Sequence, residues 1–99
     1  MDKELIYQAL VDIQNVCLAS KDNILIAIQA LDLLISTENG YSIYSHEFAN
    51  YLKNHHFIDL TNDELNSVLP EIIQRLGTRL EPMKTLSDPH ELRYKIFLA

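Results

Sequence analysis

The sequence has little of several residue types that mark special classes of protein. Its 99 residues include one cysteine, Cys17, two glycines, three prolines and no tryptophan. A single cysteine excludes an internal disulfide, and scarce glycine and proline argue against a loop-rich scaffold. The longest unbroken apolar run, residues 24–28, is far shorter than the roughly 20 apolar residues of a membrane span. With acids at positions 2 and 4 instead of a basic signal-peptide start, we expect a cytoplasmic protein without a membrane segment.

Basic residues are also scarce. Eight lysines and arginines stand against fourteen aspartates and glutamates, a formal net charge of −6. This charge opposes nonspecific binding to phosphate backbones and anionic membranes, and it favours a basic partner. The imbalance is uneven, since residues 1–52 carry seven acidic residues against two basic ones, whereas residues 72–99 carry five basic residues against three acidic ones.

What is present is an ordinary globular composition, 47% hydrophobic and 22% charged. A chain of this length buries roughly two-thirds of its unfolded surface, which is enough for one core. We therefore expect a single domain over residues 1–99. Within it we expect an added N-terminal helix in residues 1–19, a helical core in residues 20–77 and a β-hairpin in residues 78–99.

Two helices are predicted in the first half of the chain. Apolar residues in 4–18 recur every three or four positions, which predicts one buried helix face. They are Ile6, Leu10, Ile13 and Cys17. Residues 24–35 are apolar at all but two positions, so a helix there must be covered on more than one side. We expect it to be the central helix, to end at Asn39 and Gly40, and to be covered by the first helix.

Capping signals predict two further helices. The Ser45 hydroxyl is suited to cap a short third helix. Thr61 and Glu64 stand at the spacing of a capping box, which predicts the start of a fourth helix that ends at Gly77. Pro70 lies in the middle of this helix and removes a backbone donor, so we expect either a bend or two short helices.

The C-terminal segment has a different period. From residue 92 apolar and polar residues alternate, which predicts a final β-strand with one buried face. Its partner is expected in residues 78–86, joined by a turn at residues 87–90, and Pro82 restricts that partner to an edge or a bulge. The predicted fold is α+β and mostly helical, with about four helices followed by a C-terminal two-stranded β-hairpin.

This order of elements resembles the winged helix-turn-helix superfamily, in which three helices precede a terminal hairpin. The resemblance is carried by Glu47, Phe48, Ala49 and Leu52, by residues 68–76 in the position of the recognition helix, and by residues 77–80 entering the hairpin. It covers residues 21–99 and leaves the first helix as an addition. The resemblance implies a winged-helix-like arrangement and a homodimer formed through the first helix.

Tyrosines gather near the junction of the second and third helices. Tyrosine is enriched at protein interfaces because it combines a large contact area with a polar tip. Core packing with the hydroxyls at the surface is the alternative. The residues expected to bind a protein partner are Tyr41, Tyr44, Glu47 and Tyr51.

Duplex DNA would need lysines or arginines at phosphates. The start of the fourth helix instead offers Asp63 and Glu64, which would repel phosphates. The basic C-terminal segment supplies the candidates for nucleic-acid binding, with ordinary solvated charge as the alternative. These candidates are Arg75, Arg79, Lys84, Arg93 and Lys95.

No pattern predicts catalysis, a metal or a cofactor. His55 and His56 are adjacent, so in a helix their side chains point about 100° apart and cannot readily share a metal ion. His46 lies nine residues before His55, which is not a usual ligand spacing. Two glycines do not make a phosphate-binding loop, and Cys17 on a buried stripe would be inert.

Three functional hypotheses remain. The leading one is a non-enzymatic acidic protein–protein interaction module, an adaptor, a subunit or a stoichiometric inhibitor, whose basic partner is of a kind that can handle nucleic acid. The alternative is a winged-helix transcription regulator that binds duplex DNA as a dimer. The third, a helical inhibitor of the immunity type, requires that residues 78–99 form no strands.

Overall fold

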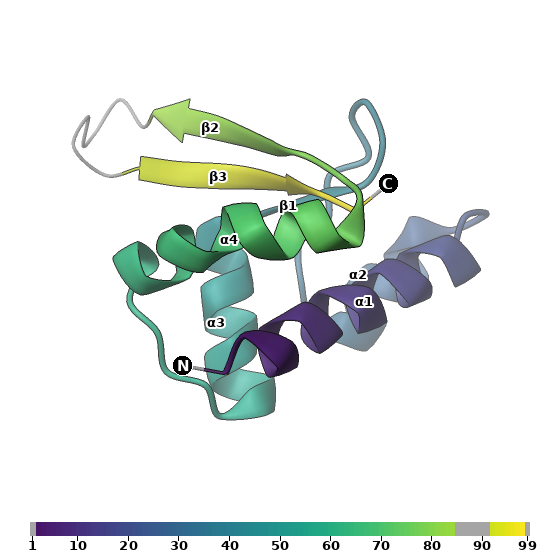
Figure 1. Ribbon diagram of the computed structural model, residues 1–99. Coiled ribbons are helices and arrows are strands. Elements are labelled where there is room, and N and C mark those ends of the chain that lie inside the picture. The colour runs from purple at the N-terminus through teal and green to yellow at the C-terminus, as the bar shows by residue number, and fades with distance from the viewer. Residues whose placement is uncertain (1, 85–91, 99) are drawn as a thin grey trace.

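A computed structural model describes residues 2–84 and 92–98 of the chain, and within these residues four helices accompany a three-stranded antiparallel sheet (Figure 1). The elements are α1 (Lys3–Ala19), α2 (Ile24–Leu31), β1 (Ser42–Tyr44), α3 (Ser45–His56), α4 (Asn62–Leu76), β2 (Leu80–Lys84) and β3 (Leu92–Phe97). Helices α1, α3 and α4 lie on one side of the sheet (Figure 1). The predicted α+β, mostly helical class is confirmed, and the C-terminal strands exclude the strandless inhibitor.

Helix α1 forms as its apolar pattern predicts. The Asp2 side chain accepts hydrogen bonds from the backbone N–H groups of Glu4 and Leu5, which caps the first turn. The predicted stripe is buried together with one alanine, so the buried residues of α1 are Ile6, Ala9, Leu10, Ile13 and Cys17. They belong to one continuous core with residues of α3, α4 and β3.

Helix α2 is shorter than expected. It ends at Leu31, and Asp32 adopts the left-handed conformation with φ 51° and ψ 47° as its C-cap. The chain then runs extended, with Leu33 and Ile35 buried, until Ser36 exchanges two backbone hydrogen bonds with Ser42. The expected helix end at Gly40 is therefore wrong. Residues 33–35 fit the apolar pattern of a helix, but in the structure they alternate between core and solvent as in an extended segment.

Of the first two helices, α1 and not α2 supplies most of the buried side chains. Only Ala27 and Leu31 of α2 are buried, whereas α1 supplies five buried residues. Leu25 and Ile26 on α2 are 61% and 57% exposed. The prediction that residues 24–35 form the central helix is wrong, because α4 packs against α1, α3 and β3 and occupies that place.

The sheet has one strand more than predicted. Its order is β1-β3-β2, so the final strand lies in the middle and pairs antiparallel with both neighbours. The alternation from residue 92 correctly predicts β3, and β2 is the expected partner with Pro82 on an edge strand. Strand β1 is too short to carry a recognisable period. The predicted turn at residues 87–90 lies outside the described residues.

Helices α3 and α4 meet their predictions in part. Ser45 does not cap α3, because Tyr44 is the N-cap and the buried Ser45 Oγ instead accepts a hydrogen bond from the Tyr94 backbone N–H at 2.9 Å. The capping box of Thr61 and Glu64 is confirmed, as is the end of α4 at Gly77, which has φ 81°. α4 continues through Pro70 rather than splitting into two short helices.

Pro70 is tolerated because it lies on the exposed side of α4. Buried residues on both sides of it, Val68, Leu69, Ile72 and Ile73, hold the helix against the core. Their combined packing outweighs the loss of one helical hydrogen bond.

The unequal burial of α1 and α2 can be tested with two leucines. We expect Leu10→Ala, which removes a fully buried side chain, to lower the free energy of unfolding by about 2–5 kcal/mol. The matched change Leu25→Ala should alter it by no more than about 0.5 kcal/mol, since Leu25 is mostly exposed. Urea denaturation measures both, and a larger loss for Leu25→Ala would show that α2 is the central helix.

Candidate functional site

Two of the four residues expected to bind a partner lie together. Tyr44, at the end of β1, and Glu47, in the first turn of α3, line a cavity of about 240 Å³. Its other lining residues are Leu34, His46, Met83 and Arg93. We call this the sheet cavity. The Tyr44 and His46 rings stack with their centroids 5.7 Å apart, which orders one wall.

Strand register explains why these residues meet. Opposed residues in an antiparallel pair project to the same face, and the pairs are Tyr44 with Lys95 and Met83 with Arg93. Ile43 and Ile96 project to the opposite face and are buried in the core. The sheet cavity therefore opens on the face of the sheet that does not cover the core, between the β1–α3 junction and the C-terminal strands.

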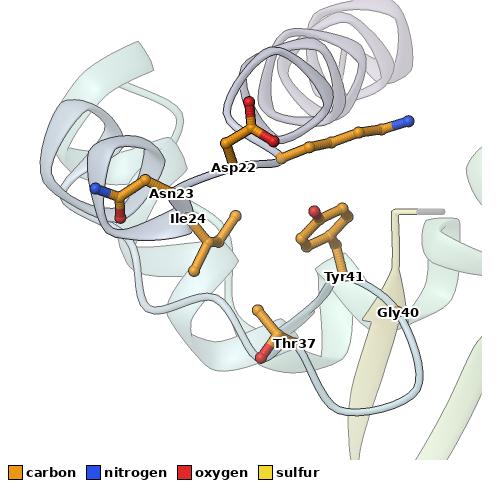
Figure 2. Close-up of a pocket in the computed structure, with 7 residues that line it drawn as sticks. Asp22, Asn23, Ile24, Thr37, Gly40 and Tyr41 are labelled. Atoms are coloured by element: carbon orange, nitrogen blue, oxygen red, sulfur yellow. The ribbon is translucent and has the colours of Figure 1, made fainter.

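Tyr41 belongs to a different place. It lines a wider cleft of about 570 Å³ with residues of the α1–α2 turn and of the loop before β1. Figure 2 shows the Tyr41 ring pointing into this cleft towards Ile24 and Thr37. Its backbone carbonyl accepts a hydrogen bond from the Leu98 N–H at 2.8 Å, which fixes the ring at the end of the sheet.

Tyr51 lines neither the cleft nor the sheet cavity. Its ring lies 4.9 Å from the His55 ring and packs against the core. Burial raises the pKa of its hydroxyl, and the negative charge of Asp12 on α1 raises this pKa further. The structure thus joins Tyr44 with Glu47 and separates Tyr41 and Tyr51 from them.

Three of the five candidates for nucleic-acid binding share the face on which the sheet cavity opens. Arg79 lies opposite Phe97, Lys95 opposite Glu81, and Arg93 opposite Met83. The Arg79 guanidinium lies 4.1 Å from the centre of the Phe97 ring and the Lys95 ammonium 5.3 Å from it, so both cations cover a buried aromatic ring. Lys84 pairs with Leu92 at the other end of β2.

Arg75 is engaged elsewhere. Its Nη1 lies 2.7 Å from Oε1 of Glu4, and its guanidinium lies 4.0 Å from the centre of the Tyr7 ring. One turn away, Lys3 Nζ lies 2.9 Å from Oε2 of Glu71. These contacts join the start of α1 to the exposed side of α4, and the Glu4 hydrogen bond raises the pKa of the Arg75 guanidinium above its ordinary value.

Sequence reasoning missed the apolar outer face of α2. Four residues at helical spacing are exposed there: Leu25, Ile26, Gln29 and Ala30. We call them the α2 face. Exposed acids stand at both ends, Asp22 in the turn before α2 and Asp32 at its C-cap. The sequence did carry a signal for this face. Almost every position of α2 is apolar, whereas one buried stripe needs only three or four apolar residues in every two turns, so some apolar side chains had to remain outside the core.

Other chemistry finds little support in the described part of the chain. Residues 2–84 and 92–98 contain no group of three histidine, cysteine or acidic side chains able to hold a metal ion. No helix among these residues is long and apolar enough to span a bilayer. Cys17 is buried, and burial raises the pKa of its thiol, which disfavours the reactive thiolate.

Comparison with known proteins yields no relative. No family model matches the chain, and no curated protein or solved structure matches it significantly. A proposal for its function must therefore stand on the geometry described above.

The ion pairs between α1 and α4 predict an acid-dependent stability. The Lys3 hydrogen bond and charge, aided by Arg75, hold the pKa of Glu71 below its ordinary value of 4.5. A carboxyl whose pKa is lower in the folded state contributes stability above its unfolded pKa, and this contribution disappears as the pH falls through the folded pKa. Thermal midpoints measured from about pH 6 to about pH 3 should therefore fall more in the wild type than in Glu71→Gln.

Lys3→Met supplies the matched control, since it removes the other half of the pair. It should flatten the same acid limb, and the double variant should flatten it no further than either single change. Parallel curves for the wild type and Glu71→Gln would contradict this prediction.

Proposed function

We propose that this protein is a non-enzymatic, acidic protein–protein interaction module. It acts as an adaptor, a subunit or a stoichiometric inhibitor, and its partner is basic and of a kind that can itself handle nucleic acid. One observation carries the proposal: large exposed apolar side chains and exposed carboxylates occur together in residues 1–52. Leu25 and Ile26 are adjacent on α2, between the exposed Asp22 and Asp32. Exposed apolar patches rimmed by polar groups are typical of interaction sites.

The apolar part of this observation is specific to one half of the chain. Among the described residues, six large hydrophobic side chains are exposed, and five of these belong to residues 1–52. They are Leu5, Leu18, Leu25, Ile26 and Leu34. Each would gain by leaving water in a complex, at about 25 cal/mol for every Å² that becomes buried.

The charged part favours a basic partner. Six of the seven carboxylates in residues 1–52 are exposed, and Lys21 is the only lysine or arginine between Lys3 and Lys53. Complementary charge raises association rates and discriminates against acidic proteins. A homodimer through α1, whose exposed apolar residues are Leu5 and Leu18, remains a prediction that light scattering can check.

Affinity capture with charge variants tests the proposal. We expect the immobilised full chain to retain a basic protein that elutes as salt is raised, because screening weakens contacts between exposed charges. The variant Asp22→Asn/Glu38→Gln should retain less of it. The matched variant Asp59→Asn/Glu81→Gln removes the same charge from the other half and should retain as much as the wild type. Equal loss in both variants, or an acidic partner insensitive to salt, would contradict the proposal.

DNA binding is the second candidate, and the basic side chains on one face of the sheet favour it. Arg79, Arg93 and Lys95 share that face, and α4 ends at Gly77 just before β2, as in the winged-helix order of elements. The first turn of α4, the helix in the recognition position, carries exposed Asp63 and Glu64. These carboxylates would meet phosphates, so we rank this function second.

Fluorescence anisotropy of a labelled mixed-sequence duplex separates the two functions. The interaction proposal predicts no binding even at low salt. If the duplex binds, Arg79→Ala and Lys95→Ala should each weaken binding and reduce its salt slope by about 1. Lys53→Ala, which removes an exposed lysine of α3, serves as the control and should change neither.

A further inference from the structure

We propose that the α2 face is a docking site for a basic amphipathic helix of a partner protein. The inference rests on the proposed function and adds the surface, the occupant and its pattern. The apolar stripe of the partner helix packs on Leu25 and Ile26. Its lysines or arginines reach Asp22 and Asp32 at the two ends of α2.

The shape of α2 suits a helix. Leu25 and Gln29 form one row along the axis, and Ile26 and Ala30 form the adjacent row, since residues four apart stack on one face. The small Ala30 side chain at one end allows close approach of a second helix, while the leucine and isoleucine at the other end provide ridges. The helix of eight residues is about 12 Å long, which matches about two turns of a partner helix.

Asp32 is the residue that folding of α2 explains least. A negative charge at a helix C-terminus is disfavoured by the helix dipole, and α2 has no basic residue in its last turn to offset it. Aspartate, like asparagine, tolerates the left-handed conformation, so the backbone permits Asp32 but does not require its charge. A lysine or arginine of the partner helix would offset this unfavourable charge at the end of α2.

Asp22 supplies a second carboxylate in the turn before α2, where it is exposed. The cleft in Figure 2, which Asp22 and Ile24 line and into which the Tyr41 ring points, lies on the other side of α2. At 100° per residue, Ile24 projects about 170° away from the centre of the α2 face, so the partner helix meets Asp22 at the end of α2 and not in the cleft.

A second copy of this chain fits the α2 face less well. Pairing two α2 helices would bring together two carboxylates, from Asp22 and Asp32, for every ammonium group supplied by Lys21. Like charges facing each other in an interface suppress association. A basic partner relieves this repulsion, and a second copy adds to it.

The test is a titration of the isotope-labelled full chain with a synthetic helix of leucine and lysine, in which the leucines recur every three or four positions. The amide signals of residues 22–32 should shift on binding. Leu25→Gln/Ile26→Gln should weaken binding by about tenfold or more. Asp32→Asn, which suits the left-handed conformation at least as well, should weaken binding severalfold and flatten its salt dependence.

Three controls make the outcome decisive. A peptide with the lysines replaced by glutamates should not bind, and Phe57→Gln, which removes an exposed apolar side chain at the end of α3, should leave the affinity unchanged. Circular dichroism should show that each variant is folded. The inference would be overturned if Leu25→Gln/Ile26→Gln and Asp32→Asn both left the affinity unchanged. It would also be overturned if the wild type formed a dimer that Leu25→Gln/Ile26→Gln dissociates.

The failure of this inference can be told from that of the proposed function. If the peptide binds in a salt-dependent way but its affinity falls with Tyr44→Ala and not with the α2-face variants, docking occurs at the sheet cavity. That result overturns the α2 site and leaves the proposed function standing. If neither the peptide nor a basic protein binds at low salt, both fall.

Discussion

Burial of the α1 stripe is the interaction on which the rest of the structure depends. Ile6, Leu10 and Ile13 have no exposed surface, and they join α4 and the last strand in one core. Gln14 on the same helix donates a hydrogen bond to the Leu98 carbonyl at 2.7 Å, so both ends of the chain meet at α1. The sheet can have β3 in its middle because α3 and α4 cover that strand on the core face.

The exposed surfaces follow from this arrangement. Helix α2 covers the core with only two buried residues, and its Leu25 and Ile26 side chains face water. The extended segment after Asp32 pairs with β1, which brings Leu34 to the sheet cavity beside Tyr44. An acidic apolar surface and a partly basic sheet face therefore lie on different elements, and this division supports the proposed preference for protein over DNA.

Local patterns predicted most of the elements. The α1 stripe, the capping box of Thr61 and Glu64, and the alternation in β3 each depend on residues close in sequence, whose spacing already states which face is buried. The small share of α2 in the core could not be predicted in this way, because two apolar helices compete for one core and periodicity ranks neither. For the candidate site, Tyr44 and Glu47 are three residues apart and stayed together. Tyr41 and Tyr51 were separated by the turn of the chain around β1.

The amino-acid sequence by itself determined the α+β class, the helix starts, the final strand and the concentration of acid in the first half, since each follows from composition or short-range spacing. Tertiary structure alone decided three things. It ended α2 at Asp32, because Ser36 gained a backbone partner in Ser42. It placed β3 between β1 and β2. It also left Leu25 and Ile26 in water, because the volume of the core is limited and side chains of α1, α3, α4 and the sheet fill it.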